Sequence, residues 1–243
     1  KRAYARAIVD RPFRDQFGLL DWEETLLADA PGYDWPSPNS RLDFFYVSGT
    51  GQLGLTEYNA ETPAGAAYDD ALAEVFMDAP AVREFSRHYD LMTMPAVPGV
   101  VGAILAAWYE FAGTRRRPRI AILDWDDVPT RTEFELYRAH FATLGIEAVI
   151  DDPRRCEYRD GKLWVAGKPA DLIYKRVLIS ELIETCGLAH DVVRAVREGA
   201  VCLVDGFRCK ILHKKASLAV LSDEANAALF SPDELEAIHD CIP

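Results

Sequence analysis

The sequence contains no long apolar run. No stretch of its 243 residues approaches the ~20 consecutive apolar residues that a membrane-spanning helix needs. The first residues, Lys1-Arg2-Ala3-Tyr4, do not lead into an apolar segment of the signal-peptide type. We therefore expect no membrane partner and a cytoplasmic location.

Cysteine and histidine are few and scattered. The five cysteines never form a Cys-x-x-Cys pair, and the five histidines form no closely spaced pair of ligands. Structural zinc sites commonly take two ligands from such a pair. The sequence therefore predicts free, buried thiols in a reducing compartment and no zinc site.

Positive charge is also scarce. The chain has 27 lysines and arginines against 39 aspartates and glutamates, which gives a net charge of −12. Binding to a phosphate backbone or to an anionic membrane surface needs clustered basic residues, so the composition argues against nucleic acid as the main partner. With 49% apolar residues, a chain of this length can bury a large core without disulfides or metal.

Residues 1–116 form the first predicted segment. It begins as a helical stretch, is broken by the prolines and glycine of residues 31–40, and continues into a β-hairpin and then helices. In one helix Leu72, Val75 and Phe76 share a face, which we expect to lie in the core. A second core-facing helix is predicted from apolar residues at helical intervals, namely Val101, Ile104, Leu105, Trp108 and Phe111.

Residues 117–205 form the second predicted segment, in which strands and helices alternate. Continuous or alternating apolar runs predict strands at 119–123, 146–150, 172–175 and 201–204. The helix after the first strand presents Phe134, Tyr137, Phe141 and Leu144. A strand, a helix and a strand in this order form a right-handed parallel crossover, so the segment is typical of a Rossmann-like sheet.

Residues 206–243 form a third, short segment with a helical pattern.

The run Gly49-Thr50-Gly51-Gln52-Leu53-Gly54 matches the Gly-x-Gly-x-x-Gly pattern of dinucleotide-binding proteins. That fingerprint needs a helix directly after it to hold a pyrophosphate, whereas here a β-prone run follows. We therefore interpret these glycines as the turn of a β-hairpin.

Asp124-Trp125-Asp126-Asp127-Val128 follows the first buried strand. It resembles the Asp-x-Asp start of haloacid-dehalogenase-type phosphohydrolases, in which the first Asp is the nucleophile and the second the acid/base. The resemblance also implies a later strand that ends in paired acids, whereas Val201–Val204 is followed by the single Asp205. A phosphohydrolase that uses Asp124 and Asp126 is kept as an alternative to the function inferred below.

The two strands of the predicted hairpin carry a second group of polar residues. Asp43 lies on the first strand and Glu57 and Asn59 on the second, so pairing of the strands brings two carboxylates and one amide to the same edge. Oxygen ligands of this kind suit Mg²⁺ that is shared with nucleotide phosphates. The neighbouring Arg41 could stabilise charge on a transferring phosphoryl group. The pattern predicts a seat for a magnesium-nucleotide complex.

Arg41-x-Asp43-Phe44, followed by Glu57-Tyr58-Asn59-Ala60-Glu61-Thr62-Pro63, resembles the metal-binding signature of glutathionylspermidine synthetase-like, circularly permuted ATP-grasp ligases. The resemblance implies that Asp43, Glu57 and Asn59 hold Mg-ATP and that Arg41 contacts the reacting acyl-phosphate. It further implies that Thr62 lies near a peptide-like substrate. Family members usually have Asp at the position of Glu61, whose role stays open.

A second stretch supports the same resemblance. His213-Lys214-Lys215-Ala216 and the apolar residues after it resemble a family segment, Asn-Lys-Ala, whose lysine reaches the ATP phosphates. Lys215 takes that role by position. Lys214 replaces the usual Asn and is either a second phosphate contact or a surface charge.

The resemblance implies an α/β fold, a partial circularly permuted ATP-grasp region around a Rossmann-like pre-ATP-grasp unit. The implied activity is ATP-dependent C–N bond formation through an acyl-phosphate, with a small-molecule carboxylate and an amine as substrates, of peptide-like or polyamine type. Family members continue beyond the position of Pro243, so we expect this chain to be part of the active protein. A non-catalytic nucleotide-binding protein is another alternative, and the oligomeric state is left open.

Overall fold

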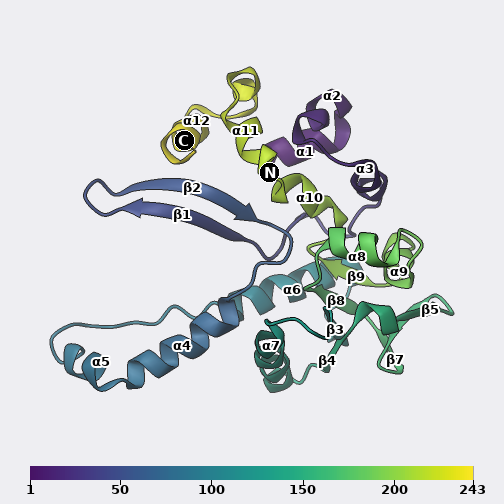
Figure 1. Cartoon of the computed structure of the whole chain (residues 1–243), viewed down its shortest axis with the longest axis horizontal. Coiled ribbons are helices and arrows are strands. Elements are labelled where there is room, and N and C mark those ends of the chain that lie inside the picture. Colours follow the sequence, from purple (N-terminus) through teal and green to yellow (C-terminus); the bar gives the residue numbers. More distant parts are fainter. Residues whose placement is uncertain (243) are drawn as a thin grey trace. The chain divides into compact units, whose positions relative to one another are not determined.

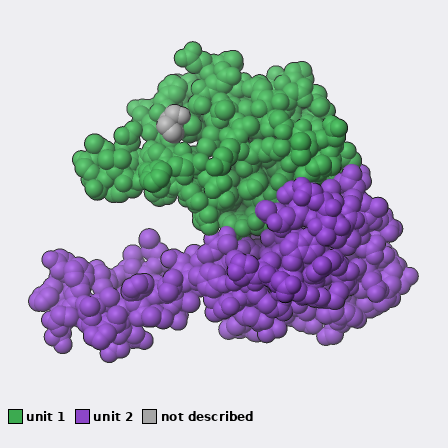
Figure 2. Space-filling view, viewed as in Figure 1, with its two compact units in different colours: residues 1–63, 205–243 green, residues 64–204 purple. Residues whose placement is uncertain are grey.

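The computed structural model describes residues 1–242 and divides the chain into two compact units, coloured separately in Figure 2. Unit 1 contains Lys1–Pro63 together with the chain from Asp205 onward, and unit 2 contains Ala64–Val204. This division differs from the three predicted segments, 1–116, 117–205 and 206–243. Residues 64–116 group with the sheet segment, and the last segment groups with the hairpin.

A four-stranded parallel sheet forms the centre of unit 2 (Figure 1). Its strand order is β4-β3-β8-β9, with β4 at Ala148–Asp151, β3 at Ile120–Leu123, β8 at Leu172–Lys175 and β9 at Cys202–Val204. Every residue of β3 and β8 is buried, as continuous apolar runs in a two-sided parallel sheet require. The predicted α/β class and the parallel sheet are confirmed.

Helices and a small antiparallel sheet surround these strands. Helix α7 (Arg131–Thr143) packs against β4, and helix α6 (Val97–Ala112) packs against β9. Phe134, Tyr137 and Phe141 of α7 are buried as expected. Leu144 is an exception, because it lies just beyond the end of α7 and is 39% exposed. The remaining elements after α6 (Val97–Ala112) are α7 (Arg131–Thr143), η2 (Pro153–Arg155), β5 (Glu157–Arg159), β6 (Lys162–Val165), β7 (Lys168–Ala170), α8 (Ile179–Cys186) and α9 (Asp191–Arg197).

Helices α4 (Ala66–Asp78) and α5 (Pro80–Phe85) extend away from the sheet of unit 2 (Figures 1 and 2). The prediction that Leu72, Val75 and Phe76 lie in the core is wrong, because these side chains are 54%, 68% and 62% exposed. They do share one face of α4, but no part of unit 2 covers that face. The second predicted helix, α6, does face the core with Val101, Ile104 and Trp108.

Unit 1 is built from short helices and a two-stranded antiparallel hairpin, β1 (Arg41–Val47) and β2 (Gln52–Asn59). Gly51 has φ +76°, a left-handed conformation that suits glycine in the turn, and β2 follows directly. The hairpin interpretation of residues 49–54 is therefore confirmed. The helices are α1 (Arg2–Val9), α2 (Arg11–Arg14), η1 (Asp15–Phe17), α3 (Asp21–Leu27), η3 (Phe207–Cys209), α10 (Lys210–His213), α11 (Ala216–Ser222), η4 (Glu224–Leu229) and α12 (Pro232–Cys241).

An apolar core holds the helices of unit 1 together. Phe13 and Phe17 meet edge to face with ring centroids 5.8 Å apart, and Ile211 and Val220 of the last segment pack in the same cluster. Among residues 1–242, no helix combines the length and apolar content needed to cross a bilayer. The described part of the chain also forms no disulfide, and Cys156, Cys202 and Cys209 are buried.

Candidate functional site

The hairpin of unit 1 brings Arg41, Asp43, Glu57 and Asn59 together. In the register of the two strands, Asp43 lies opposite Glu57 and Arg41 opposite Asn59. The Asn59 amide nitrogen donates to Asp43 Oδ2 at 3.1 Å and to Glu57 Oε2 at 3.5 Å. These four residues, the hairpin cluster, thus share one face of the ribbon, as the sequence predicted.

Arg41 and Asp43 form a two-pronged ion pair. Arg41 Nε lies 2.7 Å from Asp43 Oδ1, and Arg41 Nη2 lies 3.0 Å from Oδ2. This guanidinium lowers the pKa of Asp43 below its ordinary value, so the carboxylate is ionised at neutral pH. Both side chains are partly exposed, 48% for Arg41 and 36% for Asp43, and can be reached by a phosphate-bearing ligand.

The chemistry of the hairpin cluster fits a magnesium ion that is shared with a nucleotide. The cluster offers two carboxylates and an amide that contacts both. Mg²⁺ prefers oxygen ligands of this kind and completes its coordination shell with water and phosphate oxygens. A 180° turn of the Asn59 amide would present its oxygen in place of its nitrogen. Among residues 1–242, no three His, Cys, Asp or Glu side chains form a complete protein-only metal site. The cluster therefore suits an ion that arrives with phosphates.

A buried charge cluster that the sequence did not predict follows the hairpin. Glu61 is fully buried, and its Oε2 accepts a hydrogen bond from Lys210 Nζ at 2.9 Å. Lys210 also lies 3.8 Å from Glu23 Oε1 and over the Trp22 ring. Glu61 comes two residues after Asn59, so this ion pair fixes the end of the strand that carries the hairpin cluster. The only feature of the sequence that pointed to this buried charge cluster was the acidic residue at position 61.

The two predicted phosphate-binding lysines differ in their surroundings. Lys214 Nζ lies 2.6 Å from Glu23 Oε2 and donates to the carbonyl of Gly18 at 2.9 Å. Its charge is therefore already neutralised by a buried carboxylate. Lys215 is exposed at the N-cap of α11, and within residues 1–242 no hydrogen bond or ion pair joins it to the hairpin cluster.

An apolar pocket of about 240 Å³ lies against the other face of the hairpin. Side chains alternate between the two faces of a strand, so Leu42 and Tyr58, which are cross-strand partners, point away from the hairpin cluster. The segment that carries Lys215 lines the same pocket. Lys215 therefore belongs to the face of the hairpin opposite the hairpin cluster. The pocket is lined by Leu42, Leu55, Tyr58, Leu212, Ser217 and Leu218, among others.

Thr62, the predicted substrate residue, lies in the loop after β2 and is half-buried. In the described part of the chain its hydroxyl has no hydrogen-bond partner. No hydrogen bond within the described residues therefore fixes the direction of this hydroxyl.

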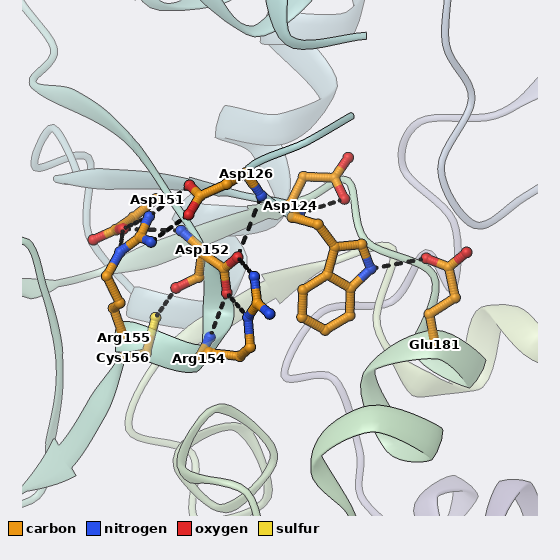
Figure 3. Close-up of polar contacts among 9 residues, drawn as sticks. Asp124, Asp126, Asp151, Asp152, Arg154, Arg155, Cys156 and Glu181 are labelled. Atoms are coloured by element: carbon orange, nitrogen blue, oxygen red, sulfur yellow. Dashed lines mark hydrogen bonds and ion pairs between the residues drawn. The ribbon is translucent and has the colours of Figure 1, made fainter. Parts of the chain in front are cut away.

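Asp124 and Asp126, the alternative candidates, lie at the carboxyl edge of the parallel sheet in unit 2 (Figure 3). Asp126 receives two hydrogen bonds from Arg155, at 2.5 and 2.8 Å, and Arg155 also contacts Asp151. In Figure 3 the Asp126 carboxylate turns toward Arg155 and the Asp124 carboxylate away from it. An acid/base partner in a phosphohydrolase has to reach the same substrate as the nucleophile. The arrangement therefore does not favour that alternative.

Asp124 is 9% exposed, and one of its oxygens accepts the backbone N–H of Trp125. Burial raises the pKa of Asp124 to about 6. Because the folded chain holds this proton more tightly than the unfolded chain, Asp124 destabilises the fold increasingly as pH rises from about 4 to about 6.

We predict that Asp124→Asn stabilises the protein at pH 7 by on the order of 2 kcal/mol and changes little below pH 4. Urea unfolding of both proteins at several pH values measures this difference. A stability difference that does not vary with pH would contradict the assignment.

No family model matches the chain, and neither does any curated protein. Among solved structures, it is similar to a glutathione synthetase-like effector from Globodera pallida in its apo form. The two share 14% sequence identity with a TM-score of 0.65, and the match covers 99% of this chain. The chain spans 57% of the length of that protein. The similarity shows that the described chain has a glutathione synthetase-like fold over nearly its whole length.

Proposed function

We propose that this chain is part of an ATP-dependent ligase that joins a carboxylate to an amine. The observation that carries the proposal is the hairpin cluster, in which Asp43, Glu57 and Asn59 meet at one point beside Arg41. The glutathione synthetase-like fold supports it, since the cluster lies within the part of the chain that shares this fold.

In the proposed reaction, a substrate carboxylate oxygen attacks the γ-phosphorus of ATP, and ADP leaves with the electrons of the broken P–O bond. The amine nitrogen then attacks the acyl carbon, phosphate leaves, and the nitrogen loses a proton. The main obstacle is the crowding of negative charge on the phosphates. A bound Mg²⁺ supplies charge neutralisation, and the protein supplies fixed ligands and cations around it.

The site residues that the sequence predicts in unit 1 take the following proposed roles, with the exception of Lys214. Asp43, Glu57 and Asn59 would hold Mg²⁺ with ATP, and Arg41 would stabilise the transferring phosphoryl group and the acyl-phosphate. Lys215 is kept as a phosphate contact on the sequence resemblance alone, since its segment lines the pocket on the opposite face of the hairpin. Lys214 is left out because Glu23 already pairs with it. Thr62 is kept as the residue near a peptide-like substrate.

Calorimetric titration of ATP with and without Mg²⁺ tests the proposal. We expect Mg-ATP to bind the wild-type chain and Asp43→Asn/Glu57→Gln to weaken its binding at least about 100-fold, or about 2.8 kcal/mol. Affinity for metal-free ATP should change far less, because the substitutions remove ligands of the ion.

A matched control lies in the small sheet of unit 2. Glu157 and Asp160 are also a glutamate and an aspartate of a hairpin, and both lie beside Arg159. Glu157→Gln/Asp160→Asn makes the same change in charge and should leave Mg-ATP affinity unchanged. Equal affinity of the wild type and the Asp43/Glu57 variant would remove the metal site from the proposal. Binding without ADP release, in the presence of carboxylates and amines, would favour the non-catalytic alternative.

A further inference from the structure

The pairing of β1 with β2 changes register beside the hairpin cluster. From the turn as far as Phe44, which lies opposite Leu55, the two strands pair residue by residue. The next residue of β1, Asp43, lies opposite Glu57, so Thr56 has no residue opposite it in the described hairpin. Thr56 is therefore the extra residue of a β-bulge. Such bulges are frequent beside functional sites, where they redirect side chains.

The apolar pocket on the other face of the hairpin leads to the same conclusion. Leu55 and Tyr58 both line this pocket, although they are three positions apart in β2. In a regular strand, two residues an odd number of positions apart point to opposite faces. The extra residue between them is what allows both side chains to reach one face.

The bulge decides which face of the ribbon carries Glu57 and Asn59. If the pairing continued from Leu55 without an extra residue, Thr56 would lie opposite Asp43. Glu57 and Asn59 would then point to the pocket face, because a shift of one residue turns every side chain beyond it to the other face. Asp43 would remain on its own face without the two side chains of β2 that complete the hairpin cluster.

The Thr56 side chain holds the bulge in place. Its Oγ1 donates to the backbone carbonyl of Asp43 at 3.0 Å, across the ribbon and at the position where the register changes. Thr56 is exposed, so its side chain does not contribute to the apolar core of unit 1. The hydrogen bond joins the extra residue of β2 directly to the residue of β1 that supplies a carboxylate to the hairpin cluster.

We propose that Thr56 is a positioning residue of the metal site, which acts through the bulge by setting Glu57 and Asn59 on the face that carries Asp43. This proposal rests on the proposed function, because the metal site is the hairpin cluster described there. It goes further by giving a role to a residue that does not itself contact the ion.

Deletion of Thr56 and the substitution Thr56→Val test the extra residue and its hydroxyl in turn. Deletion lets the strands pair regularly, so we expect calorimetry to show Mg-ATP binding weakened about 100-fold, as in Asp43→Asn/Glu57→Gln. Thr56→Val keeps the shape of the side chain but loses the hydrogen bond to Asp43, and should weaken Mg-ATP binding about fivefold. Thr56→Ser keeps the hydroxyl and should bind Mg-ATP within about twofold of the wild type.

Thr50 provides the matched control. It is the other threonine of the hairpin, is also exposed, and its Oγ1 accepts the backbone N–H of Gln52 at 3.3 Å in the turn. Thr50→Val removes a comparable hydrogen bond and should leave Mg-ATP affinity unchanged. Urea unfolding checks that every variant folds, and the affinity for metal-free ATP should change far less than the affinity for Mg-ATP.

The outcomes separate this proposal from the metal site itself. A wild-type chain that binds no Mg-ATP overturns the metal site and the role of Thr56 together. If Asp43→Asn/Glu57→Gln weakens Mg-ATP binding but either the deletion or Thr56→Val leaves it unchanged, only the role of Thr56 is overturned. Equal losses of affinity for Mg-ATP and metal-free ATP in the Thr56 variants also contradict that role, because they indicate general damage to the hairpin.

Discussion

Replacing Glu133 with glutamine is expected to lower the free energy of unfolding by about 3–5 kcal/mol. Glu133 is fully buried on α7, and its Oε2 lies 3.2 Å from Arg176 Nη2, whose side chain is 3% exposed. Glutamine keeps the shape and an acceptor for the N–H of Gly65 but removes the negative charge. The guanidinium of Arg176 would remain buried and lose its ion pair with Glu133, and this is the main cost.

The same helix offers a control for this substitution. Glu135 forms an ion pair with Arg138 in which both side chains are largely exposed, at 40% and 52%. Glu135→Gln should change the stability by less than about 0.5 kcal/mol, because exposed pairs contribute little. Urea unfolding followed by tryptophan fluorescence measures both variants. Equal stability of Glu133→Gln and Glu135→Gln would show that Arg176 does not depend on Glu133.

Replacing Lys210 with methionine should destabilise unit 1 by a similar amount, about 3 kcal/mol or more. Methionine fills much of the same volume but removes the ammonium that lies 2.9 Å from the buried Glu61 carboxylate. Because Glu61 follows the strand that ends at Asn59, the variant should also weaken Mg-ATP binding. Urea unfolding and calorimetry measure the two effects.

A second substitution separates lost charge pairing from lost packing. In Lys210→Met/Glu61→Gln the buried carboxylate is neutralised as well, so at least about 1 kcal/mol of the stability should return. Lys168→Met is the surface control, because Lys168 pairs with Glu147 where both are more than half exposed. A double variant less stable than Lys210→Met would contradict the buried-charge explanation.

Local patterns predicted those parts of the fold in which one segment determines its own environment. The apolar run at 120–123 and the run at 172–175 became buried parallel strands, because such runs suit a sheet covered on both faces. The glycines at 49–54 gave a hairpin turn for a similarly local reason.

Periodicity alone could not separate a core helix from an exposed one. Leu72, Val75 and Phe76 have the same spacing as the buried residues of α6, yet they lie exposed on α4. A helical stripe shows only that a face needs a partner and not where the partner comes from.

The buried ion pairs were also beyond the reach of the sequence. Glu133 and Arg176 are 43 residues apart, and Glu61 and Lys210 are 149 apart. Each residue looks like an ordinary surface charge until the fold brings its partner close. The hairpin cluster was easier to predict, because Asp43, Glu57 and Asn59 lie on two adjacent strands of one hairpin.

The most direct test of the central claim replaces Mg²⁺ with Mn²⁺ and measures the ion itself. Electron paramagnetic resonance reports how much Mn²⁺ stays in solution when the chain and ATP are added together. We expect the wild-type chain to hold about one Mn²⁺ per bound ATP in a ternary complex, with a spectrum that differs from that of Mn-ATP alone. Asp43→Asn/Glu57→Gln should abolish this protein-bound spectrum. The same protein-bound spectrum in the variant would contradict a metal site on the hairpin.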